Sequence, residues 1–444
     1  MFSKILIANR GEVAVRIIRA CRDMGVESVS VYSEPDRESL HVLMADEAYC
    51  IGPGRVTDSY LNKGAIISIA KATGCTAIHP GYGLLAENAD FARLCEENGL
   101  VFIGPDWQTI VKMGDKEEAR RLMKAAGVPV VPGLEDVKSA EEARSFAREA
   151  GYPVLIKAVA GGGGKGIRLV RSEEELEKKW NMARQEAGAS FGNDTLYMEK
   201  YLEDVKHVEV QVLSDTKGHH KILGERDCSV QRRNQKLIEE SPCLKINDQE
   251  RKRLYDYTLA AVESINYRGA GTIEYLMDKD RNFYFMEMNT RLQVEHPVTE
   301  AVTNIDLVQS QLRVAAGMSI EDLQVQTEGH AIECRILAED PYNGYQPSFG
   351  RIDFLHSPGG PHVRFDTFIY SGCTISPYYD SMIGKLIVWS PTRFGAIRKM
   401  RAALGELIIE GIETTTDFCL EILDQDQFLS GDFTTTDLEK QQGN

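Results

Sequence analysis

TIEYLMDKDRNFYFMEMN, residues 272–289, decides the fold of the central part of the chain. Its alternating pattern predicts an antiparallel hairpin with the turn at Lys279–Asn282, which places Glu274 opposite Glu287 on the neighbouring strand. Cβ atoms of such partners lie about 4.5–5.5 Å apart, so the two carboxylates repel unless a cation lies between them. Asn289, two residues after Glu287, points to the same face. The segment therefore predicts a hard cation, Mg²⁺ or Mn²⁺, held by oxygen ligands.

The two faces of the predicted hairpin differ in polarity. The face suited to a core would carry Ile273, Tyr275, Met277, Tyr284, Met286 and Met288. The other face would carry the two acids together with Leu276, Phe283 and Phe285. The competing interpretation is that the two acids are solvated residues on an open sheet face. Apolar neighbours on the same face favour the metal site over this alternative.

The hairpin is followed directly by Arg291, Gln293, Val294 and Glu295. A guanidinium fixed beside a metal site is suited to hold a planar oxyanion through two hydrogen bonds. Glu295 is close enough along the chain to act as a base on that oxyanion. Arg291 with Glu295 alone would more often be a structural ion pair, so the predicted oxyacid site depends on the metal site beside it.

The first hundred residues alternate strand-like apolar runs with amphipathic helical runs, from KILIANR (4–10) to LVFIG (100–104). This alternation predicts a parallel α/β domain. Its first turn, Asn9–Glu12, opens a helix but lacks the G-x-G-x-x-G spacing that lets a dinucleotide approach the backbone. The sequence therefore argues against NAD binding.

A glycine-rich tract, Gly161–Gly164, lies between two apolar runs that both look like strands. A Walker-type phosphate loop leads from strand into helix and carries Gly-Lys followed by Ser or Thr, whereas here Lys165 is followed by Gly166. The tract instead predicts a flap that folds over a triphosphate and donates backbone N–H groups, with a simple hairpin turn as the alternative. Lys157 ends the strand before the flap, where its ammonium is placed to meet phosphate charge.

Composition limits the class of protein. The 444 residues include 51 Lys and Arg against 67 Asp and Glu, and the net charge of −16 disfavours nucleic acids and anionic membranes as partners. The sequence has neither an apolar run of about 18 residues nor the pattern of a signal peptide. Its nine cysteines are scattered without C-x-x-C spacing, which is typical of a reducing cytosol. We therefore predict a cytoplasmic enzyme of about three domains.

Taken together, these motifs resemble the biotin carboxylase component of biotin-dependent carboxylases, a member of the ATP-grasp superfamily. The resemblance covers essentially the whole chain, and its most specific part is MEMNTRLQVEHPVTE (286–300). Further matching segments are KILIANRGEVAVRIIRA (4–20), HPGYGLLAEN (79–88), GGGGKGIR (161–168), GERDCSVQRR (224–233) and SPYYDSMIGKL (376–386).

The resemblance implies an α/β protein of three domains. A Rossmann-like parallel domain would span residues 1–112, and an ATP-grasp domain would span 113–329 with a glycine-rich lid at about 131–203. A C-terminal α+β domain would span 330–444.

The resemblance also implies roles for residues at matching positions. Nucleotide contacts are implied at Lys116, Lys157, Gly162, Gly163, Gly164, Glu199, Lys200, Leu202, His207, Gln231 and Asn234. Bicarbonate contacts are implied at Lys236, Arg291, Gln293, Val294 and Glu295. Arg335 matches the arginine that steadies the deprotonated ureido oxygen of biotin. Glu274, Glu287 and Asn289 fall where the family holds Mg²⁺ or Mn²⁺ in two sites, in agreement with the hairpin argument.

The chemistry implied by the resemblance uses ATP to activate bicarbonate. Glu295 would deprotonate bicarbonate, which attacks the γ-phosphate to form carboxyphosphate, and the CO₂ released from it would be captured by biotin beside Arg335. The sequence has no Ala-Met-Lys-Met attachment site, so biotin would arrive on a separate carrier protein. Carboxyltransferase subunits would complete the reaction, with acetyl-CoA as the expected acceptor, and the chain would form a homodimer.

Three features depart from the frequent family pattern. Asn234 stands where a histidine is frequent, Leu337 stands where an asparagine is frequent, and SFGR (348–351) stands where PSPG is frequent. None of these changes removes a predicted metal, bicarbonate or biotin residue.

Three other functions are compatible with parts of this pattern. The complete enzyme could serve propionyl-CoA, another acyl-CoA, pyruvate or another oxo acid instead of acetyl-CoA. A different ATP-grasp ligase would join a carboxylate to an amine and would need an amine, not bicarbonate, for ATP turnover. A nucleotide sensor would keep the fold without the chemistry, but it would have no need of the complete set from Glu274 to Glu295.

Overall fold

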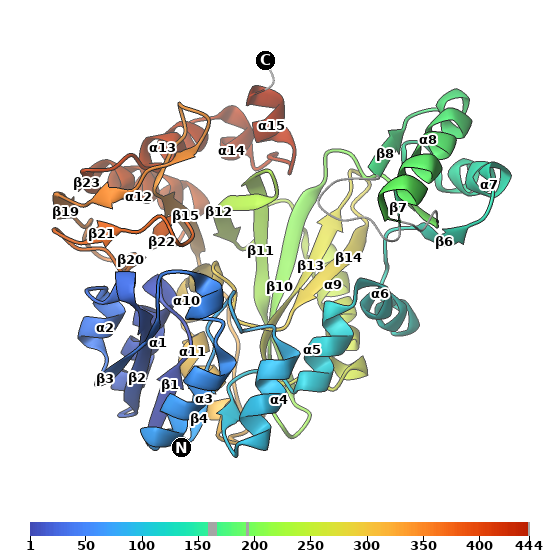
Figure 1. The fold of residues 1–444 in the computed structure, drawn as a ribbon. Coiled ribbons are helices and arrows are strands. Elements are labelled where there is room, and N and C mark those ends of the chain that lie inside the picture. The colour runs from blue at the N-terminus through green and yellow to red at the C-terminus, as the bar shows by residue number, and fades with distance from the viewer. Residues whose placement is uncertain (159–166, 192–194, 443–444) are drawn as a thin grey trace.

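The computed structural model describes residues 1–158, 167–191 and 195–442. The chain begins with a parallel five-stranded sheet in the order β3-β2-β1-β4-β5, drawn in blue in Figure 1. Its strands are β1 (Lys4–Ile7), β2 (Glu27–Ser33), β3 (Glu47–Gly52), β4 (Ala77–His79) and β5 (Val101–Phe102). Its helices are α1 (Gly11–Asp23), α2 (Leu40–Met44), α3 (Lys63–Ala72) and α4 (Ala89–Glu97). The predicted alternation of strand and helix is confirmed here.

Two helices lead from this sheet to the next part of the chain, α5 (Trp107–Gly114) and α6 (Lys116–Ala125). Asp115 ends α5 and caps α6, because its carboxylate accepts hydrogen bonds from the backbone N–H groups of Glu117 and Glu118 at 3.0 Å. This cap fixes Lys116 as the first residue of α6.

A four-stranded sheet in the order β6-β9-β7-β8 stands apart with its two helices at the upper right of Figure 1. Its elements are β6 (Gly133–Val137), α7 (Ala140–Ala150), β7 (Val154–Ala158), β8 (Ile167–Val170), α8 (Glu173–Phe191) and β9 (Leu196–Lys200). β7 and β8 pair in antiparallel fashion, so the prediction of a strand on each side of the glycine tract is confirmed. Gly162, Gly163 and Gly164 lie outside the described residues.

The largest sheet has eight strands in the order β14-β13-β10-β11-β12-β15-β22-β20. Its strands are β10 (Lys206–Ser214), β11 (His220–Arg232), β12 (Gln235–Ser241), β13 (Gly269–Met277), β14 (Phe283–Asn289), β15 (His330–Leu337), β20 (Val363–Thr367) and β22 (Met382–Ser390). β12 pairs with β15, so hydrogen bonding continues from the central into the C-terminal part of the chain.

Strand β10 shows how this sheet supports a polar site. Val208, Val210 and Val212 face the core beneath helix α9 (Asp248–Ser264), together with residues of β13 and β14. His207, Glu209 and Gln211 alternate with them and therefore face the other side, where they are also buried. One strand thus supplies both core packing and a row of buried polar groups.

The remaining elements cover the other faces and edges. They are α10 (His296–Thr303), α11 (Leu307–Ala315), β16 (Glu339–Asp340), β17 (Gln346–Pro347), β18 (Gly350–Arg351), β19 (Phe354–His356), β21 (Thr374–Ile375), α12 (Arg393–Glu406), β23 (Ile408–Glu410), α13 (Thr416–Leu423), α14 (Asp426–Ser430) and α15 (Asp437–Gln442). None of the helices in the described ranges is both long and apolar enough to cross a membrane.

A β-bulge alters the predicted hairpin of β13 and β14. Glu274 pairs with Glu287 as predicted, but Tyr275 pairs with Phe285, which leaves Met286 as an extra residue in β14. The extra residue inverts the alternation of β14 from that point to the turn, because side chains alternate with a period of two.

The bulge makes part of the predicted face assignment wrong. Phe283 and Phe285 are core residues instead of neighbours of the acids, whereas Met286 is 38% exposed and Tyr284 is partly exposed. A symmetric hairpin pairs each residue of one strand with one residue of the other and contains no bulge. A prediction based on it therefore places Phe283 and Phe285 on the same face as the acids.

We expect the shifted register to determine how much substitutions at Phe285 and Met286 lower the free energy of unfolding. Replacing Phe285 by alanine should lower the free energy of unfolding by about 3–5 kcal/mol, because it removes a fully buried aromatic ring. Replacing Met286 by alanine should cost less than about 1 kcal/mol, because that side chain lies largely outside the core. Urea unfolding of both variants measures the difference, and a larger loss for Met286→Ala would contradict the observed register.

Candidate active site

The ammonium of Lys236 is the centre of a buried ionic cluster. Its Nζ atom lies 2.6 Å from Oε2 of Glu209, 2.9 Å from Oε1 of Glu274 and 2.6 Å from Oε1 of Glu295. The four residues come from β12, β10, β13 and the residue before α10. Burial by itself would lower the pKa of this lysine, but the three carboxylates outweigh burial and hold the pKa well above its usual value.

One oxygen of Glu274 accepts three hydrogen bonds. Besides Lys236, its Oε1 atom accepts hydrogen bonds from Nδ2 of Asn289 at 2.8 Å and from Nε2 of Gln293 at 2.6 Å. Burial opposes ionisation of this carboxyl, but the charge of Lys236 holds its pKa well below its usual range. Glu274 is therefore ionised at neutral pH.

Glu287 has the opposite electrostatic environment. Burial and the negative charge of Glu274 raise the pKa of the Glu287 carboxyl. Lys116, Glu287 and Asn289 line the same cavity of about 200 Å³. A carboxyl that forms no ion pair among the described residues, opposite an ionised carboxylate and beside an amide oxygen, fits the oxygen donor set of Mg²⁺ or Mn²⁺.

We expect the affinity for Mn²⁺ to fall as the pH is lowered. The raised pKa of Glu287 means that protonated Glu287 stabilises the metal-free fold at low pH, a contribution that is lost as pH rises through that pKa. A bound cation takes the place of this proton, so affinity should weaken by roughly tenfold for each pH unit below the raised pKa. Calorimetric titration with Mn²⁺ at several pH values measures this dependence. Glu287→Gln should bind weakly with less pH dependence, and a pH-independent affinity in the unaltered chain would contradict the assignment.

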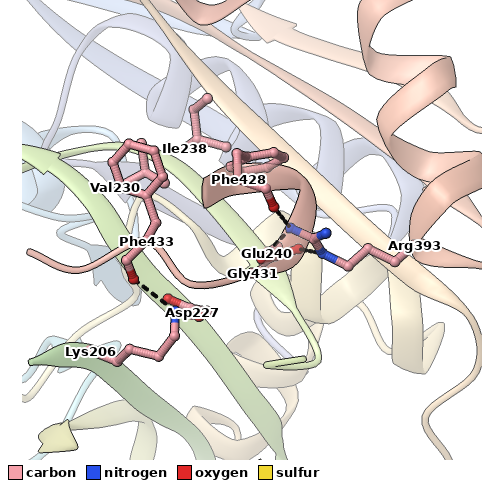
Figure 2. Close-up of a pocket in the computed structure, with 9 residues that line it drawn as sticks. All are labelled: Lys206, Asp227, Val230, Ile238, Glu240, Arg393, Phe428, Gly431 and Phe433. Carbon is pink, nitrogen blue, oxygen red and sulfur yellow. Dashed lines mark hydrogen bonds and ion pairs between the residues drawn. The ribbon is translucent and has the colours of Figure 1, made fainter. Parts of the chain in front are cut away.

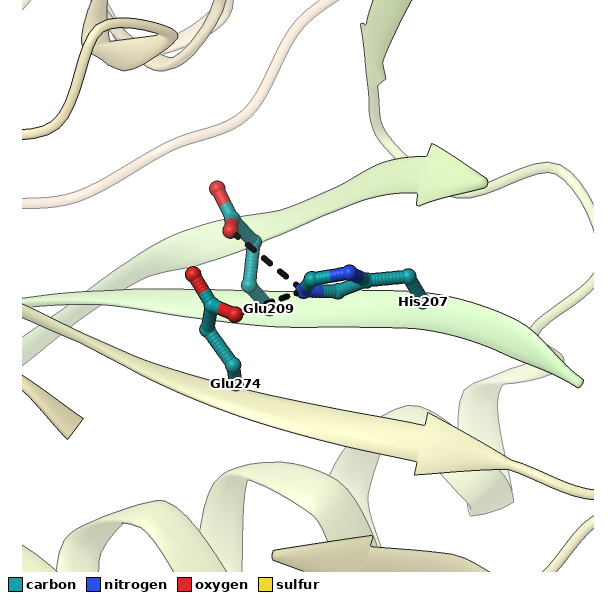
Figure 3. A group of neighbouring side chains, drawn as sticks. All are labelled: His207, Glu209 and Glu274. Atoms are coloured by element: carbon teal, nitrogen blue, oxygen red, sulfur yellow. Dashed lines mark ion pairs between the residues drawn. The ribbon is translucent and has the colours of Figure 1, made fainter. Parts of the chain in front are cut away.

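A second possible cation position is formed by His207, Glu209 and Glu274, which Figure 3 shows converging from β10 and β13. The Nε2 atom of His207 lies 2.9 Å from Oε2 of Glu274 and 3.9 Å from Oε2 of Glu209. The ammonium of Lys236 already contacts both carboxylates. Lys236 therefore supplies the positive charge that this group needs.

Arg291 is held from the N-terminal part of the chain. Its Nε atom lies 2.8 Å from Oε2 of Glu87, and its Nη2 atom donates to Oδ1 of Asn289 at 2.7 Å. Glu87 also accepts a hydrogen bond from the backbone N–H of Thr290 at 3.1 Å. The guanidinium is thus positioned directly beside the predicted metal ligands.

Arg335 joins Glu295 from the other side. Its Nη2 atom lies 3.0 Å from Oε2 of Glu295, and its Nε atom donates to Oε1 of Glu239 at 2.6 Å. Burial would raise the pKa of Glu295, but the charges of Lys236 and Arg335 outweigh it and hold that pKa well below its usual value. Glu295 is therefore an ionised carboxylate held between two cations.

The backbone of Val294 is held in place by a buried lysine. Its carbonyl oxygen accepts a hydrogen bond from Nζ of Lys385 at 2.7 Å, and the same Nζ lies 3.3 Å from Oε1 of Glu12. Lys385 is fully buried, so α1 and β22 together fix the peptide that precedes Glu295.

The predicted nucleotide residues of the four-stranded sheet form a second group. Lys157 forms an ion pair with Glu199 on the neighbouring strand β9. The Nζ atom of Lys200 donates to the backbone oxygens of Gly151 at 2.8 Å and Tyr152 at 3.0 Å. Leu202 follows β9 and is partly buried. Lys157 thus lies on β7, the strand before the glycine tract, and the other three residues lie on or just after β9, which pairs with β7.

Two further predicted residues lie at the end of β11 and in the turn after it, where Gln231 is the cross-strand partner of Lys236. Gln231 is buried in β11, and its amide donates to the backbone oxygen of Cys228 at 3.4 Å. Asn234 lies in the β11–β12 turn with a φ of 63°, after Arg233 with a φ of 47°. Asparagine tolerates this left-handed conformation well, which accounts for its presence in the turn.

Strand β11 and its neighbours also line a small cavity, shown in Figure 2, where Lys206 lies 2.8 Å from Asp227 and Arg393 lies 2.6 Å from Glu240. The Nζ atom of Lys206 also donates to the backbone oxygen of Phe433 at 2.8 Å. The volume of this cavity is only about 10 Å³. These pairs attach the C-terminal segment to the sheet.

Several residues that form or support the site were not predicted from the sequence: Glu12, Glu87, Glu209, Arg226, Glu239 and Lys385. Glu209 carried a usable signal, because it lies two residues after His207 on a strand and so faces the same side. The others lie on separate elements, and no spacing in the sequence links them to the hairpin.

Three family models match the chain in succession. The model described as "Biotin carboxylase, N-terminal domain" matches residues 1–110, and "Carbamoyl-phosphate synthase L chain, ATP binding domain" matches residues 115–323. The model described as "Biotin carboxylase C-terminal domain" matches residues 333–440.

Individual proteins match over nearly the whole length. Biotin carboxylase 1 of Bacillus subtilis is 56% identical over 443 residues, covering 99% of this chain and 98% of that protein. The biotin carboxylase domain dimer of Hydrogenobacter thermophilus 2-oxoglutarate carboxylase, crystallised with MgADP, ADP and bicarbonate, is 49% identical. It covers 100% of this chain and 98% of its own, with a TM-score of 0.89. A biotin carboxylase subunit of pyruvate carboxylase is 50% identical, covers 100% and 99%, and has a TM-score of 0.91.

Proposed function

The chain belongs to the biotin carboxylase family and is an ATP-dependent ligase, and from this we propose that it carboxylates biotin on a separate carrier protein as the first half-reaction of acetyl-CoA carboxylase. The fold has the three parts of that family, a parallel α/β domain, an ATP-grasp domain and a C-terminal domain. We place their boundaries at residues 1–112, 113–329 and 330–444, with a lid at about 131–203.

The Lys236 cluster is the observation that best supports the site. One ammonium joins Glu274, a proposed metal ligand, to Glu295, the proposed base, at 2.9 and 2.6 Å. Arg335, the proposed biotin contact, lies 3.0 Å from the same base. The residues proposed for the metal, bicarbonate and biotin are therefore linked by direct contacts.

In the first proposed step, Arg291, Gln293 and the backbone of Val294 orient bicarbonate, and Glu295 takes its proton. Mg²⁺ or Mn²⁺ at Glu274, Glu287 and Asn289 would neutralise phosphate charge. Lys116 and Lys157, from the cavity edge and the four-stranded sheet, would hold the phosphates. The bicarbonate oxygen then attacks the γ-phosphate and forms carboxyphosphate with release of ADP.

The ion pairs of Glu295 with Lys236 and Arg335 lower its basicity. A carboxylate held by two cations is a weak base, because protonation would forfeit both attractions. Lys236 and Arg335 are themselves proposed substrate contacts, so bound bicarbonate and biotin would share their charge and leave Glu295 more basic. In the second step carboxyphosphate would break down to CO₂ and phosphate, and the phosphate would take the proton from N1′ of biotin. Arg335 would stabilise the resulting ureido anion as it captures the CO₂.

The partners follow from this chemistry. The proposed assembly contains a biotin carboxyl carrier protein, carboxyltransferase subunits and a second copy of this chain. We propose a cytoplasmic location, because the nine free cysteines fit a reducing compartment. The relatives from 2-oxoglutarate and pyruvate carboxylases support oxo acids as the alternative acceptors.

The activity is tested by measuring ADP release with and without bicarbonate, free biotin and a panel of amines. We expect release that requires bicarbonate and is stimulated by free biotin. ADP release that ignores bicarbonate and requires an amine would overturn the proposal. Reconstitution with carrier and carboxyltransferase, assayed separately with acetyl-CoA, propionyl-CoA, pyruvate and 2-oxoglutarate, tests the acceptor; carboxylation of an oxo acid alone would overturn the acetyl-CoA assignment.

A further inference from the structure

Arg226, in the middle of β11, is a fully buried guanidinium with five hydrogen bonds. Its Nε atom donates to Oε1 of Glu209 at 2.5 Å, and its Nη2 atom donates to Oε1 of Gln293 at 2.9 Å. The other acceptors are Gln211 at 2.7 Å, Thr299 at 2.9 Å and Thr272 at 3.1 Å. All five N–H donors of the guanidinium are therefore used, and they reach β10, β13, α10 and the loop before α10.

The contact with Gln293 fixes which end of its amide faces the site. An arginine can only donate hydrogen bonds, so the amide oxygen must face Arg226. An ionised glutamate can only accept them, so the amide NH₂ must face Glu274, which it contacts at 2.6 Å. Arg226 and Glu274 therefore hold the two ends of the amide, and without Arg226 only Glu274 would oppose a rotation that presents the oxygen to an incoming anion.

The contact of Arg226 with Glu209 affects the charge around Lys236. Glu209 is fully buried, with one oxygen bound to Arg226 and the other 2.6 Å from Nζ of Lys236. Arg226 therefore compensates one of the three carboxylates around Lys236. This leaves more of the positive charge of Lys236 for Glu274, Glu295 and a bound anion.

We infer that Arg226 is a positioning residue for bicarbonate, which keeps the NH₂ group of Gln293 and the ammonium of Lys236 directed at the bound anion without touching it. This inference rests on the proposed bicarbonate site. Its physical basis is preorganisation: donors that already point at the anion need not be reoriented when it binds.

Arg226→Lys is the principal test. Lysine keeps a positive charge near Glu209 but lacks the planar fork that also reaches Gln293 and Thr272. We expect the KM for bicarbonate to rise by about 10- to 100-fold, as for loss of a hydrogen bond to a charged group, while the KM for ATP changes less than about twofold. An unchanged KM for bicarbonate in the folded variant would overturn the inference, and so would equal rises in both KM values.

A double-mutant cycle separates positioning from general damage. If Arg226 acts through Gln293, Arg226→Lys should raise the KM for bicarbonate much less in a Gln293→Ala background than in the unaltered chain. Equal rises in the two backgrounds would overturn the inference.

Should Arg226→Lys fail to fold, the Thr272→Val and Thr299→Val double variant provides the same readout. It removes two hydroxyl acceptors of the guanidinium and leaves every proposed substrate contact in place. A rise in the KM for bicarbonate alone supports the inference, and no rise overturns it. Absence of bicarbonate-dependent ADP release in the unaltered chain would instead be a failure of the proposed function.

Discussion

Replacing Lys236 by methionine should lower the free energy of unfolding by about 3–5 kcal/mol and the bicarbonate-dependent release of ADP by at least about 100-fold. The side chain is 11% exposed and contacts Glu209, Glu274 and Glu295, so the variant leaves three buried carboxylates without their common counter-charge. Such carboxylates regain neutrality by taking up protons, so the loss of stability should grow as the pH rises. Chemical unfolding at several pH values and an ADP assay measure the two effects.

Lys206→Met is the matched control for this variant. Lys206 is equally buried, but it contacts one carboxylate, Asp227, and a backbone oxygen on the side of the sheet shown in Figure 2. We expect this control to lose stability while retaining bicarbonate-dependent turnover at temperatures where it is folded. Added Mn²⁺ should restore more stability to Lys236→Met than to Lys206→Met, because only the first variant exposes a group of carboxylates to the cation. Full activity of Lys236→Met would contradict the assignment of the cluster.

Replacing Glu295 by glutamine should lower bicarbonate-dependent ADP release by about 100- to 10,000-fold, the range expected for loss of a general base. The amide keeps the size of the side chain but has no affinity for the proton of bicarbonate. Slow hydrolysis of ATP without bicarbonate should change little, because Glu274 and Glu287 remain in place. Steady-state assays with and without bicarbonate measure the contrast.

Glu300→Gln is the control for the Glu295 variant, since it makes the same chemical change on the helix that follows. Glu300 is also buried and ionised, but its partners are Arg16 at 2.9 Å and Arg364 at 2.7 Å, away from the Lys236 cluster. Its loss should reduce stability and leave turnover per folded molecule nearly unchanged. If both variants lose turnover equally, Glu295 acts through the structure instead of as the base.

The pairing of Glu274 with Glu287 could be predicted because an antiparallel hairpin follows local rules. A hairpin symmetric about Asp280 and Arg281 pairs Glu274 with Glu287, and the side-chain period of two fixes the face of Asn289. Between the bulge and the turn the register differs from this symmetric one, and the extra residue Met286 restores it at Glu287. The same rules failed for Phe283, Phe285 and Met286, because nothing in the sequence marks the bulge that shifts the register of β14. The backbone of Phe285 donates to the oxygen of Pro129 at 2.7 Å, a contact from outside the hairpin.

Sequence by itself determined the parallel N-terminal domain, the strands around the glycine tract, the facing acids and the identity of the proposed substrate residues from Arg291 to Glu295. These depend on interactions between residues that are close along the chain or on motifs that keep their spacing. Tertiary structure alone decided that Lys236 would bind three carboxylates and that Arg226 and Lys385 would support the loop before α10. Those contacts join strands and helices far apart in sequence, and burial makes them necessary, because a charge removed from water is stable only when its partners surround it.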